Sequence, residues 1–226
     1  MQILAIVTVA LCSIGSLAHS QTAPTQSEIA AFSPLFEAAH SGTAEDVRAA
    51  LAKGADIAQR DNRQRLATHV AAFASNEDAL SALAAAGADM NALEFQLYDV
   101  VTIASVANDP RMVETAIALG NRPDLITSIY DGTALIAAAH LGHQKVVEIL
   151  IKAGAPLDHV NNLGWTAVME AVVLGDGGPD HVETARLLVK AGADLSITDN
   201  AGATPLEHAE QRGYSEMAAV LRSKGP

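Results

Sequence analysis

The chain has 226 residues, half of them hydrophobic, and carries a formal net charge of −12 with only 4% aromatic residues. Because nucleic-acid affinity comes largely from basic contacts with phosphates, this acidic balance argues against nucleic acid as a partner. The low aromatic content predicts helices packed closely through small side chains rather than a large aromatic core.

The first 20 residues have the pattern of a secretory signal peptide. An apolar run from Ile3 to about Leu17 is followed by small residues, and we expect cleavage between Ser20 and Gln21. No basic residue precedes the run, so a single-pass membrane anchor is the alternative, although a comfortable span needs roughly 20 apolar residues. The only cysteine, Cys12, lies in this segment. We therefore expect an exported protein, periplasmic or secreted, with neither a disulfide nor a membrane span in its mature chain.

One phrase closes successive segments of the mature chain, as LAKGADI, AAAGADM, LIKAGAPL and LVKAGADL. The glycines at this position, Gly54, Gly87, Gly120, Gly154 and Gly192, are separated by 33, 33, 34 and 38 residues. A second phrase, seen as TALIAAAHLGH and TPLEHAEQRG, recurs with the same step. After a short linker at 21–27, these phrases define six units, near 28–60, 61–93, 94–126, 127–160, 161–198 and 199–226.

Each unit is predicted to form two short helices and a turn. In the fourth unit, Thr133 can cap the first helix, Gly142 interrupts the chain, and Gly154 follows the second helix, where a left-handed cap favours glycine. A single pair of such helices cannot bury its apolar face, whereas stacked pairs bury a continuous core. The sequence therefore predicts an all-α solenoid.

These units resemble the ankyrin repeat, whose pattern is a turn followed by G-x-TPLHxAA, GH, VVxxLL and GADvN over 33 residues. The fourth unit, DGTALIAAAHLGHQKVVEILIKAGAPLD, and the sixth, DNAGATPLEHAEQRGY, match it closely, and the resemblance extends from about residue 28 to 225. It implies an all-α ankyrin solenoid of helix-turn-helix units joined by hairpin-like turns. It also implies protein binding through the turn tips and the exposed side of each first helix, which line a concave groove.

Two units depart from this pattern. The third has Leu97 in place of the turn glycine, Asp99 and Val100 in place of Thr-Pro, and the ending GNRPDL, so the family pattern leaves the geometry of its loop open. The fifth has five additional residues around GDGGPDH, which predicts a small excursion between its two helices.

No catalytic, phosphate-binding or zinc-binding motif is present, so we expect neither an enzyme nor a bound metal or cofactor. The resemblance implies structural hydrogen bonds for His69, at the TPLH position, and for His143 and His181, at the GH position. A remote alternative is an enzyme or cation site at the loop of Asp176 and Asp180, although a calcium loop needs more oxygen ligands. We expect that loop to be a solvated turn.

When the chain is aligned with the family pattern, four of its eight aromatic residues fall at the turn tips. These four, Phe95, Tyr98, Tyr130 and Trp165, form a predicted aromatic row across units three to five. Exposed aromatic residues are enriched where protein interfaces concentrate their binding energy. The alternative is that some of these rings pack on adjacent turns. Arg63 and Arg65 lie near this row. They either form a basic patch that attracts an acidic partner or are ordinary solvated side chains. The candidate partner-binding residues are Phe73, Phe95, Tyr98, Tyr130, His140, Leu163, Trp165, Arg63 and Arg65.

The sequence thus predicts a monomeric, non-catalytic scaffold that binds a periplasmic protein through its concave face, as an assembly or protective factor. The alternative is an inhibitor or immunity protein that blocks a periplasmic toxin or hydrolase.

Overall fold

A computed structural model describes residues 21–223 of the chain, so the expected signal peptide lies outside the described residues. Thirteen helices and no strand occur between residues 21 and 223, where pairing of extended backbone is limited to an isolated bridge between Thr127 and Gly132. The predicted all-α solenoid is confirmed. Within the same range, no helix combines the length and the apolar character that a membrane crossing requires.

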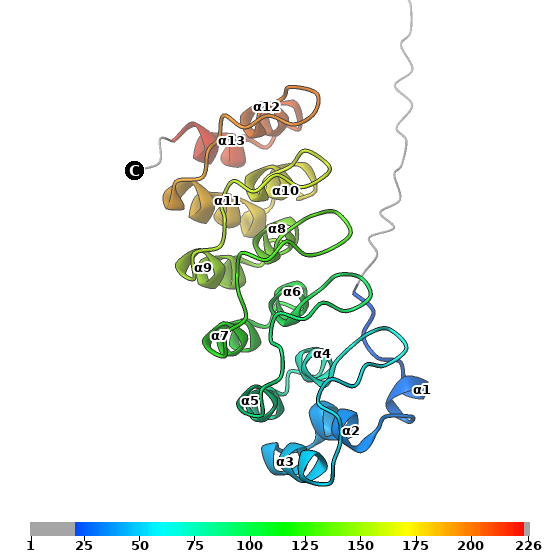
Figure 1. Cartoon of the computed structure of the whole chain (residues 1–226). Helices are drawn as coiled ribbons and strands as arrows, with labels where there is room; N and C mark the ends of the chain where they lie inside the picture. The colour runs from blue at the N-terminus through cyan, green and yellow to red at the C-terminus, as the bar shows by residue number, and fades with distance from the viewer. Residues whose placement is uncertain (1–20, 224–226) are drawn as a thin grey trace, which may run out of the picture.

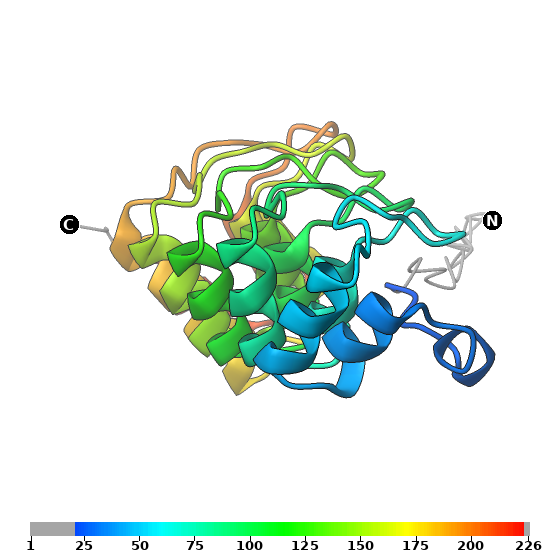
Figure 2. The ribbon, with the colours of Figure 1, turned by 60° about the horizontal axis from the view of Figure 1, so that its bottom comes forward.

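Twelve of the helices stack in two parallel rows, and the loops that join successive pairs all project to one side (Figures 1 and 2). The inner row consists of α2 (Pro34–Ser41), α4 (Ala67–Phe73), α6 (Val100–Val106), α8 (Ala134–His140), α10 (Ala167–Val173) and α12 (Pro205–Gln211). The outer row consists of α3 (Ala44–Ala52), α5 (Glu77–Ala85), α7 (Pro110–Ala118), α9 (Gln144–Lys152), α11 (Pro179–Ala191) and α13 (Ser215–Arg222). Each helix contacts its own partner and the corresponding helix of the next pair.

Local sequence signals start and stop the outer helices. Thr43, Asn76 and Asp109 cap α3, α5 and α7 by accepting a hydrogen bond from a backbone N–H in the first turn. The recurring glycine follows the end of each outer helix except α13, with φ between 84° and 100°, and a Cβ added there would meet no atom within 4 Å. Glycine is therefore required by backbone conformation rather than by space.

The core lies between the two rows and repeats from unit to unit. Large aliphatic side chains on the outer helices, such as Leu80, Val113, Val147 and Leu188, are fully buried. The inner helices present mainly alanine and valine to the same core, which lets the rows approach closely. Burying one Val or Leu contributes about 1.5–3 kcal/mol, so the stack is stabilised by the same small term many times over.

The insertion in the fifth unit lengthens helix α11 (Pro179–Ala191) in addition to forming a loop. Helix α11 has 13 residues, whereas the other outer helices have eight or nine, and it begins at Pro179, two residues before His181. Part of the insertion therefore adds about one turn to α11.

The third loop, whose geometry the sequence pattern left open, has the same backbone hydrogen bonds as the loop before it. Leu97 adopts the left-handed conformation that glycine takes in other units, with φ of 64°. The buried Asp99 caps α6 and accepts a hydrogen bond from Asn121 Nδ2 at 2.7 Å, while Asn121 Oδ1 accepts from Val101 N at 3.1 Å. The unusual residues of this unit thus supply each other's polar partners.

Side chains at the start of the outer helices fasten successive units together. His143 Nδ1 lies 2.9 Å from the Ser105 carbonyl, and His181 Nε2 lies 2.9 Å from the His140 carbonyl. Asn76 Nδ2 donates to the Gly42 carbonyl at 2.9 Å. Each bond links the beginning of an outer helix to the end of the preceding unit's inner helix or its connecting turn, in agreement with the structural role implied for these histidines.

His69 caps α4, where the N-cap residue, Leu66, has no polar side chain. Its Nδ1 accepts from Leu66 N at 2.9 Å, and its Nε2 lies 3.0 Å from the carbonyl of Ala92 in the next loop. This arrangement requires a neutral ring with the proton on Nε2. Burial lowers the pKa of His69 to about 4.

Residues 21–27, the expected linker, cross the concave side of the first three units. Gln21 Nε2 donates to the Thr102 carbonyl in α6 at 3.0 Å, and Thr22 N donates to Gln96 Oε1 at 3.2 Å. The chain then forms the short helix α1 (Gln26–Ile29) beside the projecting loops (Figure 1). We call residues 21–29 the N-terminal strap.

The glycine cap gives a prediction about stability. Gly154→Val should lower the free energy of unfolding by about 1–2 kcal/mol, because a β-branched residue resists the left-handed conformation while the site itself has room for the side chain. Gly154→Asn should cost less, since asparagine tolerates this conformation, and Gly178→Val should also cost less, because Gly178 has φ of −76°. Chemical denaturation of the three variants measures the order, and equal costs would contradict this account.

The buried histidine gives a second prediction. The pKa of His69 is 6.5 in the unfolded chain, and burial lowers it to about 4 in the folded chain. The neutral ring therefore stabilises the fold fully above pH 6.5, and this stabilisation is lost as the pH falls toward 4. The free energy of unfolding should fall by about 3 kcal/mol as the pH drops from 6.5 to 4. Denaturation across this range should show that the free energy of unfolding of His69→Gln depends much less on pH than that of the unmodified chain. We expect this variant to be less stable than the unmodified chain at pH 7. An unchanged slope in that variant would assign the titration to other groups.

Candidate protein-binding surface

The five loops that join one unit to the next share one hydrogen-bonding pattern. In each loop, one side-chain oxygen accepts hydrogen bonds from the backbone N–H groups two and four residues later. For Asp61 these N···O distances are 2.8 and 2.9 Å, and for Glu94 they are 2.8 and 3.2 Å. The acceptors are Asp61, Glu94, Ser128, Asn161 and Asp199.

Adjacent loops are also bonded to each other. Phe95 N donates to the Arg63 carbonyl at 3.0 Å, Ser128 N to the Leu97 carbonyl at 3.0 Å, and Asn162 N to the Tyr130 carbonyl at 2.9 Å. The tips therefore form a continuous surface rather than independent loops. The bond between the third and fourth loops is shifted relative to the other two, because it joins the acceptor residue Ser128 to Leu97.

The tips of the third, fourth and fifth units expose large apolar side chains. Six such residues, between 41% and 70% exposed, lie in three consecutive loops. We call this set the apolar band: Phe95, Leu97, Ile126, Ile129, Val160 and Leu163. Contiguous apolar surface on a soluble domain is typical of an interaction site, whereas isolated exposed residues are not.

The loop tips are also poor in charge. The three residues that follow the acceptor in each loop include only two charged residues, Arg63 and Asp131, although the whole chain has 40 charged residues besides histidine. Depletion of charge with enrichment of apolar residues is the compositional signature of an interface core.

The predicted aromatic row is only partly exposed. Phe95, 70% exposed, lies at a tip as expected, and Leu163, two loops away in the band, is 41% exposed. Tyr130 and Trp165 are half-buried. The expectation that Tyr98 is exposed is wrong, because it belongs to the core and is 8% exposed.

Arg65 is the second correction. Its side chain is 1% exposed and is held by Asp61 Oδ2 at 2.6 Å and Glu28 Oε1 at 2.9 Å, so it is not part of an exposed basic patch. Arg65 and Tyr98 occupy the same loop position, four residues after the acceptor and directly before the N-cap of an inner helix. There the backbone returns toward the helices and turns the side chain inward.

The remaining candidates lie around this surface. Arg63 is half-exposed and its Nε donates to Glu28 Oε1 at 3.2 Å, while Phe73 is half-buried and packs against the core. His140 Nδ1 lies 3.1 Å from the carboxylate of Glu170, which is itself buried and accepts a hydrogen bond from Asn161 Nδ2 at 2.8 Å. The partly exposed His140 is thus oriented by a buried carboxylate on the inner row.

Leu97, Ile126 and Val160 were not among the sequence candidates. Half of the chain is hydrophobic, so the presence of an aliphatic residue does not indicate whether its side chain is exposed or buried. A comparison of equivalent loop positions could have found Leu97, because the other four loops have Gln64, Asp131, Gly164 and Gly202 there. A positive φ occurs at this position in all five loops, and among these residues Leu97 carries an exposed large apolar side chain.

Burial shifts the acidity of the groups beneath the band. Removal from water raises the pKa of Glu94 and of Asp99, and it raises the pKa of Tyr98 together with the nearby charge of Glu94. These groups are bound to backbone N–H groups or neighbouring side chains and hold the loops.

The loop of Asp176 and Asp180, considered above as a remote enzyme or cation site, uses both carboxylates in hydrogen bonds within the protein. Asp176 Oδ1 accepts from Gly178 N at 2.8 Å and lies 2.9 Å from His181 Nδ1, while Asp180 accepts from Gln144 Nε2 at 2.7 Å. These hydrogen bonds lower the pKa of Asp176. Across residues 21–223, no three His, Cys, Asp or Glu side chains are grouped so that they could hold a metal ion.

The different burial of two neighbouring aromatic residues gives a testable contrast. Tyr98→Ala should lower the free energy of unfolding by about 2–4 kcal/mol, because it leaves a cavity in the core. Phe95→Ala should change it by less than about 0.5 kcal/mol, because that ring is exposed. Urea denaturation of the two variants provides the measurement, and similar losses of stability would place both rings in the core.

Comparison with known proteins agrees with this architecture. The family model "Ankyrin repeats (3 copies)" matches residues 101–199. The chain is 33% identical to the ankyrin repeat protein YahD of Escherichia coli (strain K12), over 83% of this chain and 94% of that protein.

Solved structures show the same likeness. An ankyrin repeat domain from Acinetobacter baumannii AYE has a TM-score of 0.77 and 38% identity, covering 83% of this chain and 95% of that domain. The ankyrin repeat protein EF0377 has a TM-score of 0.78 and 29% identity, covering 85% and 98% of the two chains. The recurrent helix pairs, the stacked loops and these similarities show that the chain belongs to the ankyrin repeat family.

Proposed function

We propose that this protein is an exported, non-catalytic scaffold that binds a protein partner in the bacterial periplasm through the apolar band and acts as an assembly or protective factor. The observation that supports this proposal is the band itself, six exposed apolar residues on three loops that are hydrogen-bonded to one another. Ankyrin repeats are protein-interaction scaffolds and are generally non-catalytic, which supports the coarser part of this proposal.

The shape of the surface favours a folded protein or a long segment over a small ligand. The band spans three units along the solenoid, and its side chains project from loop tips rather than lining an enclosed cavity. Small-molecule sites are usually concave and bury most of their ligand. A row of exposed side chains instead suits a partner that lies along several units.

Export is supported by the sequence pattern of residues 1–20 and by the absence of cysteine after Cys12. A cysteine-free mature chain obtains its stability from packing alone and needs no oxidative folding. The repeated core provides that packing through many fully buried aliphatic side chains.

Removal of the band should abolish partner capture without affecting the fold. The variant replaces Phe95, Ile129 and Leu163 by serine, and the matched control replaces Leu141 and Leu174, which are similarly exposed but lie at the opposite ends of the inner helices. Bait beginning at Gln21 is incubated with a soluble envelope fraction, and bound proteins are identified by mass spectrometry. We expect at least a tenfold loss of a specific partner with the variant and none with the control.

Helical circular dichroism should be the same for all three baits, since these side chains lie outside the core. Recovery of the same partner in equal amounts with both variants would show that the band is not the binding surface. The captured protein also separates the two roles: an assembly factor should preserve or raise its partner's activity, whereas an inhibitor should suppress it.

A further inference from the structure

The N-terminal strap occupies a polar groove beside the apolar band. It contacts the loop before α4, the loop before α6, and α6 itself. Glu28 Oε1 accepts from Arg65 Nη2 at 2.9 Å and from Arg63 Nε at 3.2 Å, while Arg65 Nη1 donates to the Thr22 carbonyl at 3.2 Å. The strap thus docks through the Glu28 carboxylate of helix α1, through the N–H and carbonyl groups of Thr22, and through the Gln21 side chain.

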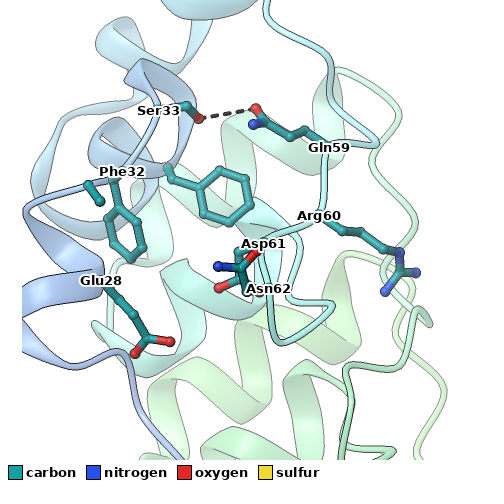
Figure 3. Close-up of a pocket in the computed structure, with 9 residues that line it drawn as sticks. Glu28, Phe32, Ser33, Gln59, Arg60, Asp61 and Asn62 are labelled. Atoms are coloured by element: carbon teal, nitrogen blue, oxygen red, sulfur yellow. Dashed lines mark hydrogen bonds between the residues drawn. The ribbon is translucent and has the colours of Figure 1, made fainter.

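The strap is held mainly by polar contacts. None of the four residues of α1 is buried, and Glu28 keeps 29% of its side chain exposed. A pocket of about 260 Å³ remains between the strap and the loop of residues 59–62. Figure 3 shows Glu28 and Phe32 on one side of it and Asp61 and Asn62 on the other, with the Arg60 side chain directed away. The strap is therefore docked on the groove without being packed into the core.

The groove requires an occupant with a negative charge. Arg63 and Arg65 face the strap, and Asp61 supplies one carboxylate to this pair. The nearby carboxylate of Glu94 accepts hydrogen bonds from N–H groups of its own loop. Without Glu28, Arg65 would keep its ion pair with Asp61 but lose its second one, and Arg63 would lose its ion pair with Glu28.

The charge of Glu28 is maintained at ordinary pH. Hydrogen bonds from the Thr25 backbone N–H and hydroxyl, together with the two guanidinium groups, lower the pKa of Glu28 to about 2. The ion pair that retains the strap is thus present at all physiological pH values.

We infer that the groove over Arg63 and Arg65 is a receptor for a short acidic peptide segment, and that the strap is its built-in occupant, which an acidic segment of a protein partner displaces. This site is distinct from the apolar band, although Phe95 and Gln96 belong to the same loop and bring the two surfaces together. Such a partner carries an Asp or Glu where the strap carries Glu28, and its backbone replaces the Thr22 carbonyl.

The test uses a synthetic peptide of residues 21–33, with a fluorophore at its C-terminus, and the chain from Gln21 onward as receptor. Fluorescence anisotropy measures peptide binding to the unmodified chain and to Glu28→Gln, in which the intramolecular competitor is weakened. We expect at least tenfold tighter binding to Glu28→Gln, weaker binding at high salt, and at least a tenfold loss when the peptide itself carries Gln at position 28. The control receptor Glu45→Gln, which removes an exposed carboxylate from α3, should behave as the unmodified chain.

Hydrogen exchange provides a second measurement on the same receptors. Backbone amides of the strap should exchange faster in Glu28→Gln than in the unmodified chain, whereas amides of α8 and α10 should be unaffected. Adding Arg63→Gln to the Glu28→Gln receptor should weaken peptide binding. Absence of peptide binding to Glu28→Gln, equal binding of the Glu and Gln peptides, or unchanged strap exchange would overturn the inference. The apolar band is intact in all these receptors, so these results are independent of its role.

Discussion

The constraint on which the surface depends is the pair of hydrogen bonds that one side-chain oxygen accepts at the start of each loop. Those bonds fix which of the following residues face solvent and which turn inward. Aspartate, glutamate, serine and asparagine all satisfy the geometry because it needs only an acceptor at the correct distance. The loops can thus vary in sequence while neighbouring tips stay hydrogen-bonded to one another, and a binding surface can be built from residues that the fold does not otherwise use.

The same constraint explains what the sequence could predict and what it could not. Glycine spacing and the two recurrent phrases predicted the solenoid, since they reflect backbone conformation and core packing that recur in every unit. Exposure at the tips was predicted correctly for Phe95 and wrongly for Tyr98, three residues later. Residue type alone does not distinguish these positions. The inward turn of Tyr98, like that of Arg65, follows from its place before an inner-helix N-cap, a geometric fact that hydrophobicity does not encode.

The third unit shows how departures from a repeat pattern can compensate one another. Asp99 replaces the usual N-cap threonine and is buried, which disfavours its charge, and Asn121 replaces the alanine of the closing phrase and donates to it. Each substitution alone would leave a buried polar group without a partner, which is costly. Leu97 has no such compensation: a non-glycine residue in a left-handed conformation places an apolar side chain in solvent. Gln64 and Asp131 have the same conformation at the equivalent position of other loops, so the feature that sets Leu97 apart is its exposed apolar side chain, which folding does not require.

The concave side is therefore divided into two chemically different parts. Units one to three carry the arginine groove and the strap, whereas units three to five carry the apolar band, and the loop of residues 94–98 belongs to both. A partner that engages both parts needs an apolar surface next to a short acidic segment. Electrostatic attraction to the groove would fix the orientation of that partner, and burial of the band would supply most of the affinity. Displacement of the strap then becomes a condition for full binding, so that selectivity arises from the intramolecular competitor as well as from the contacts with the partner.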